Sequence, residues 1–531
     1  MNIVNNILNL TLLILSFFIF LFRILFYLQV LQILEYFNIK YLRHILMRKK
    51  QEYIFDDAFL IISIILVSIN LFLKFNIFYL KIILAFLLCL SLFYNIKLYK
   101  KRKKFSKKEL NFTKRLIRIF SLNLIFFFII STFLFIYKLD TIIVYFIFIT
   151  PFTLALLNSI ILPLEIIINN RYFNHAIKII KEYRPFIIGV TGSYGKTSTK
   201  YFIYELIKDK FRAVMTPESY NTAMGITKFI RENLKKETEI FIVEIAENEV
   251  GGFKRLLKLI NPNILIITSI GIQHLEEFGS KEKILNEFKY LIDHCIKKDE
   301  CKKLILNKDN EFLNQFNNEK IIKISINSNN YPFIEILDES LFGTKFKIKI
   351  FEKETIFETK LIGKETIRNL LIAIEVSLIL KISIDEVKEK VKILEPFKHR
   401  LNVLRKGKVV VVDDAYNSNP IGAKMALDLI SKYKEGRRII ITPGFIELGK
   451  KEYEENKNFG KYMKDKVDYV FLVGGKRTKP ILEGLNEVNF PKEKIFVFKN
   501  FFEANDYLKT FLNSYDLILF ENDLPEIYEE I

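Results

Sequence analysis

A glycine-rich segment, TGSYGKTST, has the composition of a loop that binds phosphate groups. Gly192 and Gly195 let backbone N–H groups turn towards an anion, and Lys196 supplies a positive charge for the β- and γ-phosphates of a nucleotide. Thr197 adds a hydroxyl suited to Mg²⁺ at the start of a helix. Because the apolar run PFIIGV precedes the segment and an amphipathic stretch follows it, we expect a strand, this loop and a helix in that order.

Two later apolar runs each end in a residue suited to binding a metal ion. The run EIFIVEIAE places Glu244 at the end of a strand, and NILIITSIGIQH places His274 a few residues beyond the next strand. In open α/β sheets, ligands bind outside the carboxyl ends of the strands, so we expect Thr197, Glu244 and His274 to meet there. The sequence therefore predicts a site for ATP and Mg²⁺, with Lys196 and His274 as catalytic residues. Taken singly, Glu244 is equally consistent with a helix cap and His274 with an ordinary loop residue.

The elements that must position these residues follow an alternating pattern. After residue 184, short β-rich runs alternate with amphipathic helices, which indicates a parallel sheet with helices on both faces. Within residues 302–362, KIIKISI and TKFKIKIF are expected to be strands flanking that sheet. The last part alternates again, through KVVVVDD, RRIIITP, DYVFLVG, KIFVF and LILF, and is expected to be Rossmann-like. We therefore predict an α/β protein with domains at residues 1–184, 185–398 and 399–531.

The first domain is expected to be a bundle of transmembrane helices. A bilayer core needs about 20 residues of apolar helix, and five apolar runs are candidates: residues 6–36, 57–74, 77–96, 119–137 and 141–169. The first run is too long for the apolar core of a cleaved signal peptide, so we expect it to stay in the mature chain. Arg23 and Lys81 lie inside apolar runs. We interpret them as snorkelling or helix-packing residues, with a lipid headgroup or substrate site as the alternative.

The distribution of charge argues for a membrane and against a nucleic-acid partner. The net charge is +20, but residues 1–185 carry 24 Lys or Arg against 8 Asp or Glu, whereas the rest of the chain carries 56 against 52. Basic residues concentrate in the loops at 38–56 and 98–118, which the positive-inside rule places in the cytoplasm. We expect a protein integral to the cytoplasmic membrane, with its N-terminus outside and everything after about residue 170 in the cytosol.

Three cysteines outside any CxxC pair indicate neither a zinc ribbon nor a disulfide framework.

Eight motifs in the last two domains resemble the Mur ligase family. In chain order they are TGSYGKTST, TPESYNTAMGI, IVEIAENEVGGF, ITSIGIQHLEEFGSKEKI, HRLNVL, VVDDAYNSNP, TPGFIELG and ENDLPEIY. They are most similar to the branch that adds D-alanyl-D-alanine to a muramoyl peptide, and they span nearly all of residues 186–531. The resemblance implies a P-loop central domain, a Rossmann-like C-terminal domain and ATP-dependent amide formation in cell-wall precursor synthesis. In that reaction a carboxylate attacks the γ-phosphate to give an acyl phosphate, and an amine then expels phosphate.

The resemblance also assigns roles to individual positions at the triphosphate. One Mg²⁺ is expected at Thr197 and Glu244, and His274 matches the ligand of a second. Seven consecutive residues are expected to cradle the phosphates: Gly192, Ser193, Tyr194, Gly195, Lys196, Thr197 and Ser198.

Further matches concern the rest of the nucleotide. Asn369 matches a residue that contacts adenine, and Arg400 and Asp414 match residues near the phosphate and ribose. Asn417 and Asn419 fit the YNxNP turn of the same branch. These assignments agree with the chemistry, because Lys, Arg and Mg²⁺ stabilise the negative charge that develops on transferring phosphoryl oxygens.

Three departures from the family pattern bear on the site and the substrate. Many members carbamoylate a Lys at the position of Phe288, and the neighbouring Lys289 is about 100° away around the predicted helix, which favours a solvent-facing Lys. The family pattern GxHNxxN reads GKETIRN, so Glu365 and Thr366 replace a His-Asn pair. The N-terminal domain that grips the uridine diphosphate sugar is missing, and the membrane segment occupies its place.

The expected partners follow from these departures. We expect a muramoyl-peptide-like carboxylate, linked to a nucleotide or to a lipid, an amino acid or dipeptide as the amine, and the bilayer itself. Anchoring favours the lipid-linked form, because it concentrates enzyme and substrate on one surface. The C-terminal domain is expected to carry the amine and to close on ATP about a hinge near Pro396, because excluding water protects an acyl phosphate.

Two alternatives remain open from the sequence. One is a membrane transport or signalling ATPase, although DDAYNSNP and ENDLP have no role in a generic transport ATPase. The other is a polymer-forming amide ligase similar to poly-glutamate or cyanophycin synthetases, which repeated addition to a growing product would distinguish.

Overall fold

The computed structural model describes eleven stretches of the chain: residues 2–47, 57–73, 76–105, 109–217, 220–246, 250–271, 278–326, 333–350, 353–415, 419–446 and 448–523. His274, Asn417 and most of the ENDLPEIY motif lie outside the described residues. The chain divides into two compact units between Asn169 and Asn170.

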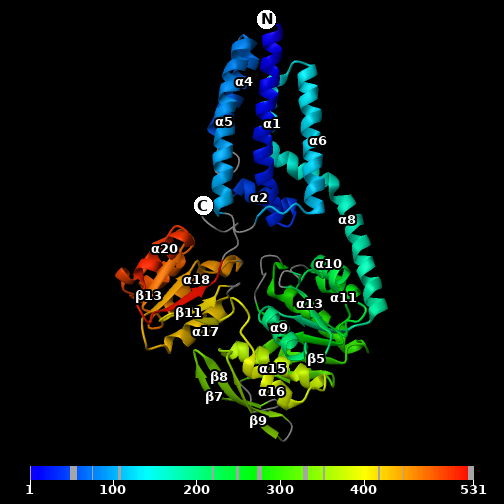
Figure 1. Cartoon of the computed structure of the whole chain (residues 1–531), viewed down its shortest axis with the longest axis vertical. Helices are drawn as coiled ribbons and strands as arrows, with labels where there is room; N and C mark the ends of the chain where they lie inside the picture. Colours follow the sequence, from blue (N-terminus) through cyan, green and yellow to red (C-terminus); the bar gives the residue numbers. More distant parts are fainter. Residues whose placement is uncertain are drawn as a thin grey trace. The chain divides into compact units, whose positions relative to one another are not determined.

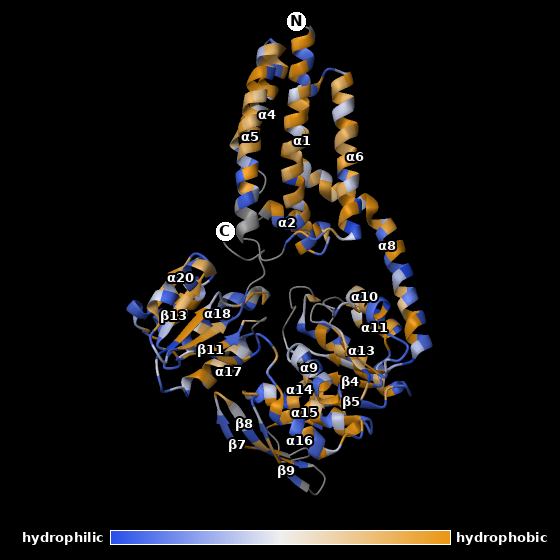
Figure 2. Cartoon of the chain, viewed as in Figure 1, coloured by the Kyte–Doolittle hydropathy of each residue, from blue (hydrophilic) through white to orange (hydrophobic). Residues whose placement is uncertain are grey.

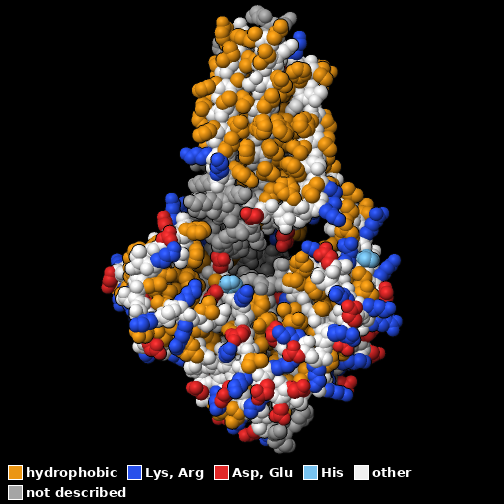
Figure 3. Space-filling view, in the orientation of Figure 1, with side chains coloured by type: hydrophobic (Ala, Val, Ile, Leu, Met, Phe, Trp, Pro, Cys, Tyr) orange, Lys and Arg blue, Asp and Glu red, His pale blue; other side chains and the backbone are white. Residues whose placement is uncertain are grey.

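The first unit is helical (Figure 1). Hydrophobic residues run along its helices (Figure 2) and dominate its surface (Figure 3). Four stretches are long and apolar enough to cross a membrane: Ile3–Ile33, Ile77–Lys100, Lys114–Ile136 and Thr150–Tyr183. The elements are α1 (Asn2–Ile33), α2 (Asn38–Met47), α4 (Ala58–Leu73), α5 (Ile77–Phe105), α6 (Lys114–Ile136), the 3₁₀ turn η1 (Asp140–Ile142), α7 (Ile143–Phe148) and the start of α8 (Thr150–Tyr183).

Two of the five expected membrane runs differ from the observed helices. The run expected at 57–74 is α4, which has 16 residues and is shorter than a standard span. The run expected at 141–169 is divided into α7 and α8. Pro151, in the first turn of α8, explains this break, because proline lacks the N–H donor that would continue the hydrogen bonds of α7 and is tolerated in the first turn of a new helix.

Lys81 forms a buried ion pair inside this apolar unit. Its Nζ lies 2.8 Å from Oδ2 of Asp140 and donates a 2.7 Å hydrogen bond to Oδ1 of Asn9. The pair joins α1, α5 and η1, and its side chains are almost fully buried. The contact supports the helix-packing interpretation of Lys81. Arg23 is also buried, and one of its N–H groups donates to the hydroxyl of Tyr27.

The second unit begins with a six-stranded parallel sheet in the order β2-β3-β1-β4-β5-β6. This is the βαβ arrangement that the alternating pattern predicted. Its strands are β1 (Phe186–Thr191), β2 (Ala213–Met215), β3 (Ile240–Glu244), β4 (Ile264–Ile267), β5 (Lys303–Asn307) and β6 (Ile321–Ile324). The helices around it are α9 (Lys196–Ile207), α10 (Ala223–Asn233), α11 (Gly252–Leu259), α13 (Lys281–Lys297), α14 (Glu311–Asn314), α15 (Lys364–Ile379) and α16 (Ile384–Ile393).

Alternate residues of these strands enter two separate cores. On β1, Ile188 packs into the core beneath α9 and α15, whereas Ile187 packs into the core beneath α10, α11 and α13. On β3, Ile242 and Phe241 divide in the same way. This alternation follows from the two-residue repeat of a strand, and it buries the sheet on both faces.

The end of α8 belongs to the second core. Phe173 and Ala176 pack into the cluster beneath α10 and α11, and the guanidinium of Arg231 lies 3.9 Å from the ring centre of Tyr172.

Residues 333–359 form a separate antiparallel sheet of β7 (Phe333–Ser340), β8 (Gly343–Ile350) and β9 (Lys353–Thr359). The two runs expected to flank the central sheet therefore have different positions. KIIKISI forms β6 of the central sheet, whereas TKFKIKIF lies largely in β8 of the separate sheet.

The last part of the second unit is a six-stranded sheet in the order β10-β11-β15-β12-β13-β14, in which only the β10–β11 pairing is antiparallel. The five strands predicted here are confirmed, and β10 is additional. The strands are β10 (Asn402–Lys406), β11 (Val409–Asp414), β12 (Arg438–Thr442), β13 (Tyr469–Val473), β14 (Ile495–Phe498) and β15 (Leu517–Glu521). The helices are α17 (Pro420–Ser431), α18 (Glu452–Tyr462), α19 (Lys479–Glu487) and α20 (Phe501–Phe511), with 3₁₀ turns η2 (Gly449–Lys451) and η3 (Lys492–Lys494).

Candidate nucleotide site

The glycine-rich loop connects the end of β1 to the start of α9, and its geometry requires glycine at two positions. Gly192 and Gly195 have φ angles of 134° and 82°, which side-chain-bearing residues rarely adopt. A Cβ on Gly192 would lie 2.4 Å from Oγ1 of Thr268, and a Cβ on Gly195 would lie 2.7 Å from Oδ1 of Asn369. The loop therefore brings its backbone close to two neighbouring segments.

Lys196 is the first residue of α9, and its ammonium group is held by the loop itself. Nζ donates to the carbonyl oxygens of Gly192 at 2.7 Å and Ser193 at 3.3 Å. Desolvation lowers the pKa of Lys196, while Glu244 opposes this shift and Arg400 adds to it. The charge thus lies within the phosphate-binding turn.

Thr197 and Glu244 are in direct contact. The hydroxyl of Thr197 donates a 2.9 Å hydrogen bond to Oε2 of Glu244, which is 2% exposed at the end of β3. Nζ of Lys200 lies 3.2 Å from the same oxygen, and the amide of Asn221 donates to Oε1 at 3.4 Å. The structure therefore joins two of the three residues predicted to hold metal, and the third, His274, lies outside the described residues.

This pair fits a magnesium ion. Mg²⁺ in nucleotide sites is bound by one or two protein oxygens and by phosphate oxygens and water. Thr197 and Glu244 provide a hydroxyl and a buried carboxylate beside the phosphate loop. Among the described residues, no cluster of three or more His, Cys, Asp or Glu forms an all-protein metal cage.

The segment after β4 supports the loop, and its contacts were not predicted from the sequence. The N–H of Tyr194 donates to Oγ of Ser269 at 2.9 Å, and the N–H of Gly271 donates to Oγ of Ser193 at 2.8 Å. Thr268 also bonds the loop through its hydroxyl. The position of Thr268 and Ser269, directly after an apolar strand, was the available sequence signal.

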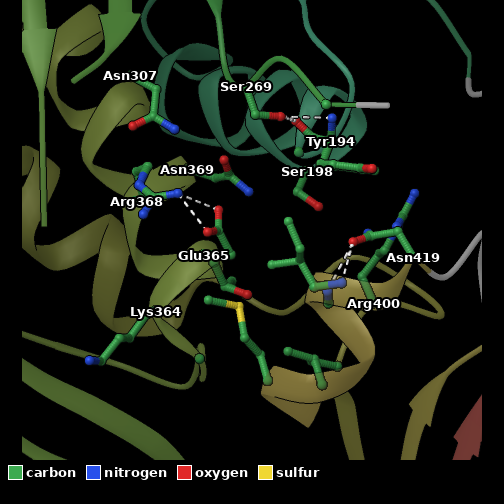
Figure 4. A pocket seen from close by; sticks show the side chains of 18 of the residues that line it. Tyr194, Ser198, Ser269, Asn307, Lys364, Glu365, Arg368, Asn369, Arg400 and Asn419 are labelled. Atoms are coloured by element: carbon green, nitrogen blue, oxygen red, sulfur yellow. Dashed lines mark hydrogen bonds and ion pairs between the residues drawn. The ribbon is translucent and has the colours of Figure 1, made fainter. Parts of the chain in front are cut away.

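A cavity of about 420 Å³ opens beside this loop (Figure 4). One side of the cavity is lined by residues near the β2–β6 sheet: Tyr194, Gly195, Ser198 and Asn369. Another side is lined by residues near the β10–β15 sheet: Arg400, Leu401, Asp414, Asn419, Ile421, Gly422 and Met425. The volume is typical of small-molecule sites. The predicted residues Asn369, Arg400, Asp414 and Asn419 thus face one space together with the loop.

Several of these residues are fixed by local contacts. Oδ1 of Asn419 accepts from the N–H groups of Ile421 and Gly422 and thereby caps α17. Oδ1 of Asp414 accepts from the N–H of Leu401 at 3.1 Å. Burial raises the pKa of Asp414 to about 6, against the opposing effects of Arg400 and this hydrogen bond. Burial likewise raises the pKa of Tyr194 to about 12.

The position at which the family resemblance implies a carbamoylated lysine in many members is apolar here. Phe288 is 7% exposed, and its ring centre lies 5.3 Å from that of Phe253. Lys289 is exposed on α13. The helix therefore directs Lys289 to solvent, in agreement with its predicted orientation.

Two stretches of the second unit match two family models. Residues 190–377 match the Mur ligase middle domain, and residues 399–521 match the Mur ligase glutamate ligase domain. Together these stretches make up more than half of the chain. The chain belongs to the Mur ligase family. It is an ATP-dependent ligase that forms C–N bonds.

Two curated relatives of the chain share one name. The UDP-N-acetylmuramoyl-tripeptide–D-alanyl-D-alanine ligase of Bacillus subtilis is 28% identical over 358 residues, which are 66% of this chain and 76% of the relative. The ligase of the same name from Borreliella burgdorferi is 25% identical over 352 residues, which are 63% of this chain and 73% of the relative.

Solved structures share the fold over about two thirds of the chain. MurF from Acinetobacter baumannii superposes with a TM-score of 0.59 at 20% identity, over 67% of this chain and 77% of that chain. MurF ligase from Thermotoga maritima, solved in complex with ADP, gives 0.58 at 22% identity, over 68% and 81%.

Proposed function

We propose that this chain is a membrane-held ligase of peptidoglycan precursor synthesis that joins a muramoyl-peptide carboxylate to D-alanyl-D-alanine or a similar amine. The observation that carries this proposal is the cavity at the phosphate loop, which residues from both matched domains line. The names of the curated relatives support the choice of carboxylate and amine.

The first chemical step activates the carboxylate. A carboxylate oxygen attacks the γ-phosphorus of ATP, ADP leaves, and an acyl phosphate forms. Lys196 and the N–H groups of residues 195–198, at the start of α9, bind the phosphates, and Arg400 supplies a second positive charge at the cavity. Fixed positive groups favour this step, because negative charge increases on the transferring oxygens.

Thr197 and Glu244 would hold Mg²⁺, which neutralises phosphate charge when bound. We also propose that His274 contributes to a second metal position, although it lies outside the described residues. His274→Ala should then raise the Mg²⁺ concentration required for turnover.

The second step forms the amide. The amine attacks the acyl carbon, phosphate leaves with the electron pair of the C–O bond, and the amine nitrogen loses a proton. We propose that the domain at 399–531 presents the amine. Asn369, from the domain at 185–398, contacts the adenine, and Asp414, from the domain at 399–531, contacts the ribose. The domain at 185–398 binds the phosphates.

We propose that residues 1–184 hold the enzyme in the cytoplasmic membrane with the ligase domains in the cytosol. The four long apolar helices and the basic segments at 38–56 and 98–118 support this placement. A lipid-linked acceptor would then meet the enzyme in two dimensions, which raises the effective concentration of both.

A substrate panel tests the proposal. The full chain in nanodiscs would receive ATP, Mg²⁺, a muramoyl tripeptide linked to UDP or to lipid, and D-alanyl-D-alanine or single amino acids. We expect ADP release only when carboxylate and amine are both present, with one addition per acceptor by mass spectrometry. Repeated addition would instead indicate a polymer-forming ligase. ADP release without any amine or carboxylate would indicate a transport or signalling ATPase.

A further inference from the structure

We infer that Glu365 is the residue that selects the nucleobase, by accepting a hydrogen bond from the exocyclic amino group of adenine. The inference rests on the proposed function, because it requires ATP in the cavity at the phosphate loop. It concerns a position at which this chain departs from the family pattern, since Glu365 and Thr366 replace His and Asn.

The position of Glu365 in the cavity is the first argument. Figure 4 shows Tyr194 and Ser198 on one side of the cavity, and Arg368 and Asn307 on the opposite side, with Glu365 between Arg368 and the open space. Glu365 therefore lies across the cavity from the glycine-rich loop, where the base of a nucleotide whose phosphates lie on that loop can reach it.

The second argument is that Glu365 is held in place by a buried cation. One terminal nitrogen of Arg368 donates to both carboxylate oxygens of Glu365 at 2.6 Å. The opposite edge of the same guanidinium contacts Oδ2 of Asp309, at 3.1 Å from Nε and 3.0 Å from Nη2. Arg368 is 6% exposed, whereas the Glu365 side chain is 39% exposed. The buried guanidinium of Arg368 thus fixes the orientation of the partly exposed carboxylate of Glu365.

The third argument is the hydrogen-bonding capacity that remains. Two carboxylates, those of Glu365 and Asp309, surround the guanidinium of Arg368, and Lys364 also lines this cavity. An ionised carboxylate only accepts hydrogen bonds, and each oxygen of Glu365 keeps a free lone pair. Among the nearby amides, Asn307 donates to the carbonyl of Thr268 at 2.8 Å and Asn310 to that of Ile270 at 2.9 Å, while the amide of Asn369 lies against Gly195 of the loop. Glu365 is therefore matched to a donor on the base.

The 6-amino group of adenine is such a donor, and a ligand that lacks only this group isolates the contact. Purine riboside 5′-diphosphate differs from ADP by the loss of that amino group. A hydrogen bond to a charged group corresponds to roughly a ten- to hundredfold difference in affinity. We expect the full chain to bind ADP more tightly than purine riboside diphosphate by that factor.

The test compares this preference in variants of the full chain in nanodiscs, by calorimetry with the two nucleotides. Glu365→Ala should reduce the preference to less than about threefold, and Glu365→Gln should leave an intermediate value, because it keeps an acceptor without charge. Glu282→Ala removes an acid from the first turn of α13 and should retain the full preference. Each preference is a ratio measured on one sample, so partial misfolding does not produce it.

The outcomes separate this inference from the proposed function. If ADP does not bind the wild type, or binds equally well to Lys196→Ala, the nucleotide site itself is wrong. If ADP binding depends on Lys196 but Glu365→Ala keeps the preference, or the wild type has none, only the role of Glu365 is overturned.

Discussion

The hydroxyl of Thr197 and the carboxylate of Glu244 form a 2.9 Å hydrogen bond that joins the first turn of α9 to the end of β3. The two residues are 47 positions apart in the sequence. The parallel pairing of β1 with β3, in which Val190 lies opposite Glu244, brings them together. This contact is the best-defined part of the candidate metal site.

Thr197→Val should weaken metal binding, because it removes an oxygen ligand while keeping a β-branched side chain. We expect Mn²⁺ affinity in the presence of ADP to fall at least roughly tenfold, as for the loss of one charge-assisted contact. Electron paramagnetic resonance of bound Mn²⁺ measures it. Thr227→Val, on α10, provides a control, and an unchanged affinity in Thr197→Val would remove Thr197 from the metal site.

Lys196→Ala should abolish ADP formation and leave membrane insertion intact. The ammonium of Lys196 lies within the phosphate-binding turn, whereas the apolar helices belong to the other unit. Turnover and membrane fractionation are measured together. Lys208→Ala, at the exposed end of α9, should retain activity. Full ADP release by Lys196→Ala would refute the role of the loop.

Asp414→Asn should make the protein more stable at neutral pH. Burial raises the pKa of Asp414 to about 6 from an ordinary value of 3.8. Between these values the unfolded chain ionises and the folded chain does not, so the folded state loses stability as pH rises and the loss is complete above about pH 6. The shift corresponds to about 3 kcal/mol at most.

Thermal unfolding of both proteins between pH 4 and 8 measures this effect. We expect the Asp414→Asn variant to match the wild type near pH 4 and to exceed it above pH 6, since asparagine still accepts from the N–H of Leu401. A constant difference across this range would show that Asp414 has an ordinary pKa.

A fragment that starts at Asn170 should fold and remain soluble, whereas one that starts at Pro185 should be less stable. The second fragment lacks Phe173 and Ala176, which pack beneath α10 and α11. The loss of a buried Phe costs about 3–5 kcal/mol. Thermal unfolding compares the two fragments, and Phe173→Ala in the longer one should reproduce much of the difference. Aggregation of the longer fragment would contradict the division of the chain between Asn169 and Asn170.

Lys81→Leu should destabilise the helical unit by about 3–5 kcal/mol, because it leaves the buried carboxylate of Asp140 without its cation. The double variant Lys81→Leu, Asp140→Leu should recover most of that loss. Unfolding in bilayers by denaturant measures both. Equal destabilisation by the single and double variants would argue against an ion pair.

Local sequence patterns predicted much of the fold and of the loop. Gly192, Gly195 and Lys196 lie within one motif of nine residues, and apolar runs predicted the strands of the two six-stranded sheets. The rule that ligands bind at the carboxyl ends of parallel strands also predicted the meeting of Thr197 and Glu244, but other contacts between distant segments could not be predicted. Neither the hydrogen bond from Tyr194 to Ser269 nor the ion pair of Lys81 with Asp140 produces a periodic pattern in the sequence.

The largest differences between the predicted and the observed fold have local causes. The run at 141–169 looks continuous in hydropathy, but Pro151 divides it into α7 and α8. Likewise, β8 alternates between Lys and apolar residues, as expected of a strand with one open face. That pattern suits the separate antiparallel sheet better than the buried parallel one.

Transfer of oxygen from substrate to phosphate tests the proposed reaction most directly. The full chain would receive ATP, Mg²⁺, D-alanyl-D-alanine and a muramoyl tripeptide labelled with ¹⁸O in the reacting carboxylate, and mass spectrometry would follow the released phosphate. An acyl phosphate intermediate predicts that each phosphate carries one ¹⁸O atom from the carboxylate. Unlabelled phosphate, formed while ATP is consumed, would mean that water attacks ATP and would contradict the account.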